Sequence, residues 1–381
     1  MAVTQKIEIN NNDVLKSLQD FFRSILEMEY ISAILVPQKL PMKNMVMPTL
    51  VTNPEDLAHV DPLAPVFPLN AGRMAAKLTR KQLGGKVLVV LRSCELRAFV
   101  ELVKLKQART EEIILLSIDC LGAFQNRDYF KIVKDGAADT TRSFYESVLA
   151  GKSGAMSGHE IAPACQACEY PIPEKADILI GLFGVDINDH LLVQANTENG
   201  ESFLNGLNLP EAAVPAKRKE TIDNLLKGRK AYRDAMFENT REAINDIEKL
   251  TTYFANCVNC YNCRVACPVC YCRECVFYTD VFDHESSQYL QWSRRKGIIK
   301  MPTDTVFYHL TRLAHMSTAC VGCGQCSNAC PNDIPVMEVF RTVSQRTQDA
   351  FGYEAGRSLD EKPPLSEFRE EEFEDIVGID A

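Results

Sequence analysis

The chain has 381 residues, 15 of them cysteine, and a formal net charge of −9. Its length allows a substantial hydrophobic core without disulfides, and its acidic balance argues against a nucleic-acid-binding protein. Because no apolar run approaches the roughly 20 residues of a membrane-spanning helix and no secretory signal is seen, we expect a cytoplasmic chain with reduced thiols.

The first half of the chain predicts an α/β layer. Helical spacing of apolar residues begins after Asp13, a suitable N-cap, and leads into a strand near residue 36. Prolines between residues 37 and 70 then favour loops and short extended pieces. The next predicted elements are a helix at 71–83, a strand at 86–91, a helix at 95–107, a strand at 112–118 and strand-like sequence at 176–196. Helices that alternate with continuously apolar strands are typical of a parallel sheet.

Two cysteine motifs of identical spacing lie 63 residues apart. Each reads C-x2-C-x2-C-x3-C-P, the spacing of bacterial ferredoxins that hold two [4Fe–4S] clusters. In that arrangement three cysteines of one motif and the fourth of the other bind each cluster. The first predicted ligand set is Cys257, Cys260, Cys263 and Cys330. The second predicted set is Cys320, Cys323, Cys326 and Cys267.

Structural zinc is the alternative for these eight thiols, since zinc also prefers thiolate ligands. Zinc sites usually use two C-x2-C pairs or add histidines, so a third cysteine at the next step would have no role. We therefore expect iron–sulfur clusters. His284, His309 and His315 lie nearby, and we interpret them as surface or packing residues.

Five further cysteines are grouped, and we predict that a third cube draws its ligands from them. They are Cys165 and Cys168, which form a C-x2-C pair, and Cys270, Cys272 and Cys275, which follow the first motif. The pair would bind with two of the latter three. Buried structural thiols are the alternative. Cys94 and Cys120 stand alone after strands, and for them both packing and a place beside a cofactor remain open.

Three stretches, together with the cysteine-rich region, resemble a known family. They are "VLRSCELRAFVELVKLKQ" (90–107), "SIDCLGAF" (117–124) and "CQACEYPIPEKADILIGLFG" (165–184). Their order resembles the β-subunits of coenzyme F420-reducing hydrogenases and related formate dehydrogenases, over most of residues 70–335. The second cysteine motif and "CPVCYCREC" are more similar to the formate dehydrogenase branch. The resemblance implies an iron–sulfur flavoprotein subunit of an oxidoreductase complex.

The resemblance also implies FAD, held by an α/β body that is not of the Rossmann type. No G-x-G-x-x-G follows a strand, which agrees. Gly72 would open a helix whose amides meet the pyrophosphate, and nearby arginines would donate charge-assisted hydrogen bonds. The candidate flavin residues are Asn70, Gly72, Arg73, Arg92, Cys94 and Arg97. The alternative is that these arginines are solvated helix residues.

These features predict an electron-transferring β-subunit whose partner is a catalytic formate dehydrogenase or hydrogenase chain. Coenzyme F420 or another low-potential carrier would be its redox partner. The alternative is a flavin-free relay that feeds a heterodisulfide-reductase-like complex. A zinc-dependent nucleic-acid-binding protein, suggested by basic runs at 216–219 and 293–296, disagrees with the acidic total.

We divide the chain into four predicted parts. They are an α/β flavin-binding body at 1–215, a helical linker at 216–252, a mainly α-helical ferredoxin-like region at 253–345 and an acidic tail at 346–381. Residues 360–381 hold nine acidic and two basic residues with large apolar side chains between them. Such a segment is expected to dock on a partner subunit.

Overall fold

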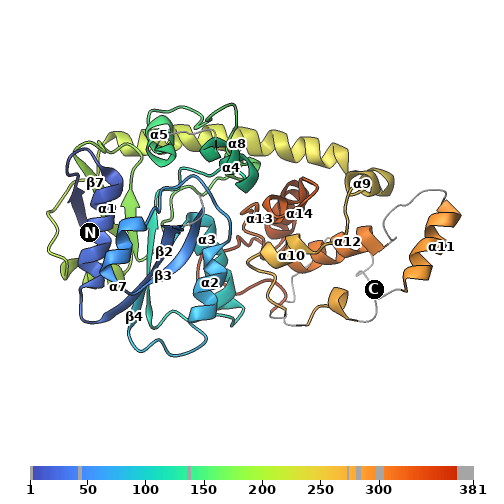
Figure 1. Ribbon diagram of the computed structural model, residues 1–381, viewed down its shortest axis with the longest axis horizontal. Coiled ribbons are helices and arrows are strands. Elements are labelled where there is room, and N and C mark those ends of the chain that lie inside the picture. Colours follow the sequence, from blue (N-terminus) through green and yellow to red (C-terminus); the bar gives the residue numbers. More distant parts are fainter. Residues whose placement is uncertain are drawn as a thin grey trace.

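A seven-stranded sheet forms the centre of the larger half of the molecule (Figure 1). The structure is a computed structural model that describes residues 3–41, 45–134, 139–272, 274–279, 285–296 and 304–366. The strands lie in the order β1-β7-β6-β5-β4-β2-β3. Their bounds are Thr4–Glu8 for β1, Ile31–Lys39 for β2, Val46–Val51 for β3, Lys86–Leu91 for β4, Ile113–Ile118 for β5, Ile178–Gly181 for β6 and His190–Ala195 for β7.

The sheet is parallel in its middle and antiparallel at both edges. β2, β4, β5 and β6 run parallel to one another, whereas β3 pairs antiparallel with β2, and β7 lies antiparallel between β6 and β1. A parallel connection needs a crossover of roughly a dozen residues or more. The links from β2 to β3 and from β6 to β7 are shorter. The expected α/β layer is confirmed, but as a mixed sheet and not a purely parallel one.

Helices bury both faces of the central strands. Leu88 and Val90 belong to the same core as α1 and α5, whereas Val87 and Val89 face a second core formed with α2 and α3. Burial on both faces explains why these strands are continuously apolar in sequence. The helices of this half are α1 (Val14–Leu26), η1 (Pro54–His59), α2 (Ala71–Leu78), α3 (Ser93–Lys104), α4 (Asn126–Lys134), α5 (Thr140–Leu149), α6 (Pro163–Gln166) and α7 (Glu198–Asn205).

The helix ends follow from specific hydrogen bonds, some local and some between distant residues. Asp13 caps α1, as predicted, because its carboxylate accepts the N–H of Lys16 at 2.9 Å. The predicted helix at 71–83 is shorter in the structure and ends at Leu78. Its C-cap Thr79 is held by Arg109, which donates from Nε to the Thr79 carbonyl and from its own N–H to the Thr79 hydroxyl. A contact from 30 residues further along the chain therefore ends the helix.

A long helix connects the sheet body to the second half. α8 spans Lys217–Ala243 and runs along one side of the molecule (Figure 1). Arg218 in its first turn donates from Nη1 and Nη2 to the buried carboxylate of Asp119, at 2.6 and 3.0 Å. The same carboxylate accepts the backbone N–H groups of Leu182 and Phe183. This ion pair ties the start of α8 to the ends of β5 and β6.

The cysteine-rich half is mainly helical and has its own hydrophobic core, which includes Phe254, Tyr308 and Phe340. Its elements are α9 (Ile247–Tyr253), α10 (Asn262–Ala266), η2 (Val276–Tyr278), α11 (Ser286–Lys296), α12 (Asp304–Met316), α13 (Gln325–Asn328) and α14 (Val336–Ala350). α14 continues past residue 345, where we placed the start of the acidic tail.

After α14 the chain returns to the sheet body. The hydroxyl of Tyr353 donates to both carboxylate oxygens of Glu101 at 2.7 and 2.8 Å, and the N–H of Gly356 donates to the same carboxylate at 2.6 Å. Nζ of Lys104 lies 2.7 Å from Oε1 of Glu101, and both side chains are almost fully buried. The first residues of the predicted tail are thus packed against α3. Most of the predicted docking segment, residues 367–381, lies outside the described residues.

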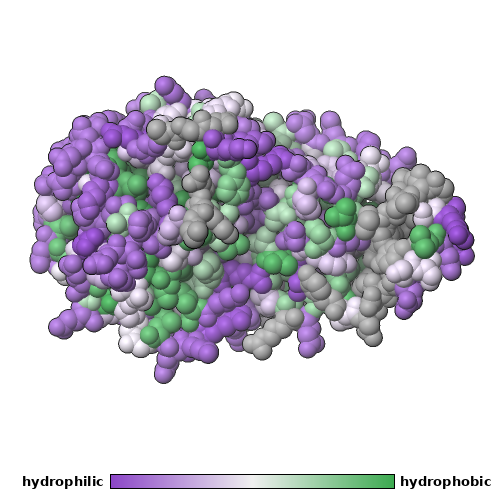
Figure 2. Space-filling model, in the orientation of Figure 1, coloured by the Kyte–Doolittle hydropathy of each residue, from purple (hydrophilic) through white to green (hydrophobic). Residues whose placement is uncertain are grey.

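The visible face of the sheet body is largely hydrophilic, with smaller hydrophobic areas between the polar side chains (Figure 2). Within the part of the chain that the structure describes, no helix combines the length and the apolar character needed to cross a membrane.

The Arg218–Asp119 pair makes a prediction about stability. Arg218→Met leaves the Asp119 carboxylate buried and without its cation, so the free energy of unfolding should fall by about 3–5 kcal/mol. Urea unfolding of both proteins, followed by circular dichroism, measures the difference. Arg241→Met, which changes an exposed arginine of the same helix, is the matched control. Equal stability of the two variants would contradict the anchoring role.

Candidate metal centres

The structure brings the first predicted ligand set together beside α10. Cys257 and Cys260 precede this helix, Cys263 lies within it, and Cys330 arrives from the second motif after α13. Burial raises the pKa of the Cys257 thiol to about 11, and Cys263, Cys330 and Cys260 contribute as electrostatic neighbours. The grouping is therefore the crossed one expected from the spacing, although the binding of a cluster there stays a prediction.

The four cysteines of the second predicted set line one cavity. They are Cys267, Cys320, Cys323 and Cys326. The other walls of the cavity include Met316, Phe340 and Arg312. Burial raises the pKa of the Cys267 thiol to about 12, and Arg312 offsets part of this increase. Four thiols with mainly apolar walls form the donor set and the dry surroundings that suit a [4Fe–4S] cluster.

Three side chains of α12 point at the sulfur atoms of the first set. Arg312 Nη1 donates to Cys263 Sγ at 3.1 Å, and the hydroxyl of Tyr308 lies 3.4 Å from the same sulfur. His309 Nε2 lies 3.4 Å from Cys257 Sγ, and its ring stacks on Phe254 with centroids 3.8 Å apart. Hydrogen bonds to ligand sulfurs are a recognised means of tuning cluster potential. We missed this role for α12, although the i, i+4 spacing of Tyr308 and Arg312 places them on one helix face.

Histidines 284, 309 and 315 were interpreted as surface or packing residues. His309 is buried and packed, with the added contact to Cys257. His315 is exposed, and His284 lies outside the described residues.

A third group of thiols forms where the sheet body meets the second motif. Cys94 begins α3 just after β4, Cys120 follows β5, and Cys165 and Cys168 lie in and after α6. Burial raises the pKa of Cys94 well above its ordinary range, and its thiol neighbours are Cys323, Cys120 and Cys168. Burial likewise raises the pKa of Cys165 to about 12, with Cys120 and Cys168 as neighbours.

This grouping differs from the predicted third cube. The thiol neighbours of Cys270 include Cys272, Cys275 and Cys267, whereas those of Cys165 are Cys120 and Cys168. Two adjacent parallel strands, β4 and β5, end at the same edge of the sheet and deliver Cys94 and Cys120 there. The positions of both cysteines directly after apolar strands place each at a strand end, but they do not show which strands are neighbours.

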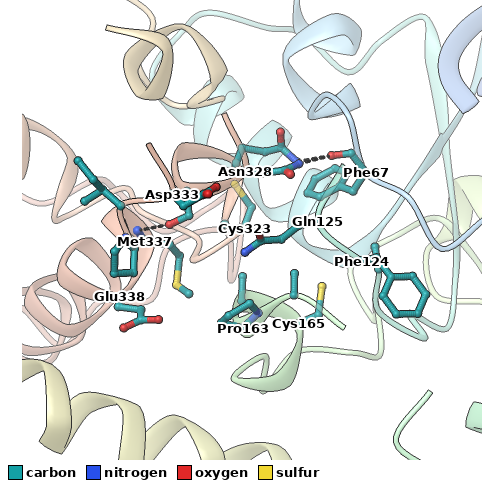
Figure 3. Close-up of a pocket in the computed structure, with 18 residues that line it drawn as sticks. Phe67, Phe124, Gln125, Pro163, Cys165, Cys323, Asn328, Asp333, Met337 and Glu338 are labelled. Carbon is teal, nitrogen blue, oxygen red and sulfur yellow. Dashed lines mark hydrogen bonds between the residues drawn. The ribbon is translucent and has the colours of Figure 1, made fainter. Parts of the chain in front are cut away.

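A pocket opens between the sheet body and the second motif (Figure 3). Cys165 from the body and Cys323 from the motif both line it, together with Phe67, Phe124 and Met337. Gly324, at φ +77°, allows the two parts to approach, since a Cβ there would lie 2.4 Å from Cβ of Ala164. The second and third thiol groups therefore face each other across a close contact.

The helix predicted to hold a pyrophosphate has its first amides occupied by the protein itself. The carboxylate of Glu95 accepts the N–H of Ala71 at 2.6 Å, and the side chain of Asn70 accepts the N–H of Gly72 at 3.0 Å. A Cβ on Gly72 would lie 2.3 Å from the carbonyl oxygen of Glu95, so this glycine serves the close packing of α2 on α3.

The predicted arginines are also occupied. Arg92 donates to the carbonyl oxygens of Ala64, Val66 and Gly122, and Arg73 donates to that of Val265. Arg97 donates from Nη1 to a backbone carbonyl, and its Cζ lies 3.6 Å from the ring centroid of Tyr170; only its Nε and Nη2 lack a partner among the described residues.

The first amides of α2 and the guanidinium groups of Arg92 and Arg73 do not fit an FAD pyrophosphate in the predicted way, because they already have protein acceptors. Two of the predicted flavin residues lie instead at the thiol groups. Cys94 belongs to the third group, and the side chain of Asn70 lies beside Cys323 and partly offsets the effect of burial, which raises the pKa of that thiol.

Comparison with known proteins now identifies the cysteine-rich half. The family described as a 4Fe–4S dicluster domain matches residues 253–334, which contain both motifs. The chain therefore combines a mixed α/β sheet body with a 4Fe–4S dicluster domain near its C-terminus. Within the described ranges, no group of three or more His, Cys, Asp or Glu side chains has the spacing of a single-ion site.

Two curated relatives align with almost the whole chain. The β-subunit of an F420-dependent formate dehydrogenase from Methanocaldococcus jannaschii is 24% identical over 94% of this chain and 97% of its own length. That of F420-dependent formate dehydrogenase 1 from Methanococcus maripaludis is 27% identical over 90% of each chain. The chain is a homologue of formate dehydrogenase β-subunits. The predicted resemblance to formate dehydrogenase β-subunits is confirmed, and so is the assignment to an oxidoreductase subunit.

Among solved structures, a chain of the xenon-derivatised F420-reducing [NiFe] hydrogenase complex from Methanosarcina barkeri is also similar. The match has 16% sequence identity and a TM-score of 0.46, and it covers 64% of this chain and 93% of that chain.

The raised thiol pKa values of this formate dehydrogenase β-subunit homologue predict a pH dependence for the iron-free chain. Cys257, Cys165 and Cys267 ionise near 11 to 12 when folded, against 9.0 for an unperturbed thiol. Above about pH 9 the unfolded chain therefore loses more protons than the folded chain, and stability falls as pH rises. Thermal unfolding of the reduced, iron-free chain should give a constant midpoint from pH 7 to about 8.5 and a falling one above.

The control for this prediction is the Cys165→Ser, Cys267→Ser double variant, measured over the same pH range. It should lose less stability above about pH 9, because two of the shifted thiols are gone. The same decline in both proteins would assign the effect to other groups.

Proposed function

We propose that this chain is the electron-transferring β-subunit of a formate dehydrogenase complex, with three [4Fe–4S] clusters in a row. The main support for the proposal is that Cys323 of the second thiol group is a close neighbour of Cys94 of the third. This contact links the dicluster domain to the sheet body. The homology to formate dehydrogenase β-subunits supports the assignment to such a complex.

The third cluster is proposed to bind to Cys94, Cys120, Cys165 and Cys168. When bound, each [4Fe–4S] cluster stores and passes one electron. The chain's own residues hold the clusters by their thiolates, surround them with apolar side chains and donate hydrogen bonds to their ligand sulfurs. Because metal binding requires deprotonated thiols, the burial that raises the thiol pKa values is overcome when iron binds.

Glu169 is proposed to fix the geometry of the third site. Glu169 follows Cys168 directly in the sequence. Its carboxylate forms ion pairs with Arg233 of α8 and with Arg341 of α14, whose Nη2 lies 3.1 Å from Oε1 of Glu169. Burial alone would raise the pKa of Glu169, but the two arginines outweigh it and lower the pKa. The loop that carries Cys168 is therefore held between the connecting helix α8 and α14.

The proposed partner is a catalytic formate dehydrogenase chain, or a hydrogenase chain in a related complex. The names of the relatives favour coenzyme F420 as redox partner. A deazaflavin gives up two electrons together as a hydride, whereas a cluster takes one, so a chain that exchanges with F420 needs a flavin to separate them. FAD remains part of this proposal through the family resemblance. A cytoplasmic location would keep the fifteen thiols reduced.

A flavin-free relay is the second candidate, and one observation favours it. The amides of α2 and the guanidinium groups of Arg92 and Arg73, which we predicted for FAD, are engaged by the protein. In this candidate the clusters accept electrons singly from one partner and deliver them to another, for example a heterodisulfide-reductase-like subunit.

The three-cluster proposal predicts about twelve irons per chain in protein purified without oxygen. Cys94→Ser combined with Cys120→Ser should remove about a third of the iron and leave the electron paramagnetic resonance signals of the two ferredoxin-type clusters in place. Cys272→Ser should leave the iron content unchanged. If Cys272→Ser loses the third cluster and the Cys94, Cys120 variant keeps it, the ligands come from the trio after the first motif.

Flavin analysis separates the two candidates. We expect Arg73→Ala to leave the ratio of FAD to iron in the purified complex unchanged, because this arginine binds a backbone carbonyl. The wild-type complex is denatured in parallel and its supernatant assayed for FAD. Released FAD at about one per chain supports the flavin-containing subunit, and its absence supports the relay. A drop in FAD in the Arg73→Ala complex would restore the site predicted at α2.

A further inference from the structure

One cation lies between the two ferredoxin-type cysteine sets. Arg312 donates from Nη1 to Cys263 Sγ of the first set at 3.1 Å and from Nη2 to the backbone carbonyl of Cys263 at 3.2 Å. The same side chain lines the cavity formed by the second set, beside Cys267 and Cys326. α12, which carries Arg312, belongs to the segment that separates the two motifs in sequence.

Arg312 is buried and has no carboxylate partner among the described residues. Its exposed fraction is 4%. The guanidinium carbon lies 4.6 Å from the ring centroid of Phe340 and 5.6 Å from that of Tyr308, and Nε has no hydrogen-bond partner in the described structure. A buried charge without a partner is strongly unfavourable. The groups that surround Arg312 are cysteine side chains of the two ligand sets, which become anionic when they bind iron.

The remaining sulfur contacts are made by uncharged side chains and are specific to one set. Tyr308 and His309 approach the first set, whereas Asn70 lies beside Cys323 of the second. Arg312 differs from them in its full charge and in its position at both sets.

We propose that Arg312 sets the reduction potentials of both ferredoxin-type clusters by placing one permanent positive charge between them. Uptake of one electron adds one negative charge to a thiolate-held cluster. A fixed cation in a buried, low-dielectric site favours that more negative state, so the potentials of both clusters are raised together. The inference rests on the two clusters of the proposed function, and it needs neither the third cluster nor a flavin.

The test is an anaerobic redox titration of the purified full-length chain, followed by electron paramagnetic resonance, with iron content measured on each sample. Arg312→Gln removes the charge, Arg312→Lys keeps it without the planar fork, and Arg346→Gln changes an exposed arginine on α14 as the control. At the wild-type midpoint potential, the ratio of reduced to oxidised cluster in Arg312→Gln should fall about tenfold for both clusters, which corresponds to about 59 mV for a one-electron step. Arg312→Lys should restore most of that ratio, and Arg346→Gln should match the wild type.

The outcomes separate this inference from the proposed function. Wild-type protein that holds no iron at the two motifs contradicts the proposed function itself. Arg312→Gln with full iron and wild-type potentials overturns the inference alone, as does a shift confined to one cluster. If Arg312→Gln cannot load iron, Arg312→Lys decides: full iron with near wild-type potentials supports the role of the charge, and failure to load iron or lowered potentials overturns it.

Discussion

The crossed grouping of the cysteines is the constraint on which the second half of the structure depends. Cys330 joins the first motif and Cys267 joins the second, so neither set of thiols is complete without a residue from about 60 positions away. The two motifs must fold against each other, and α12 is enclosed by that contact. Arg312 is consequently buried among cysteine side chains, where a cation without an anionic neighbour would be unfavourable.

Buried carboxylates hold the two halves together at the boundary between them. Asp119 holds the start of α8, Glu101 holds Tyr353 and Gly356 after α14, and Glu169 joins α8 to α14 beside Cys168. Each carboxylate has a basic partner as well as hydrogen bonds, which is the condition under which a buried charge is tolerated. The third thiol group lies within this frame.

Local sequence rules predicted what depends on neighbouring residues. β4 was expected at its observed bounds because an uninterrupted apolar run follows a Gly-Gly turn, and the motif spacing anticipated both crossed thiol sets. The third thiol group required knowledge that β4 and β5 are adjacent, which no local pattern contains. Local patterns also did not show that the first amide of α2 is engaged by the protein, since its acceptor is the carboxylate of Glu95 from the next helix.

The chain leaves the sheet body at Arg218 and is fastened to it again at Tyr353 and Gly356, so the cysteine-rich half is held at both ends. A carrier domain that swings between partners needs a free hinge on at least one side. Here any rotation would have to break two buried, charge-assisted contacts at once. The two halves, and with them the thiol groups, are therefore held in one arrangement by the fold.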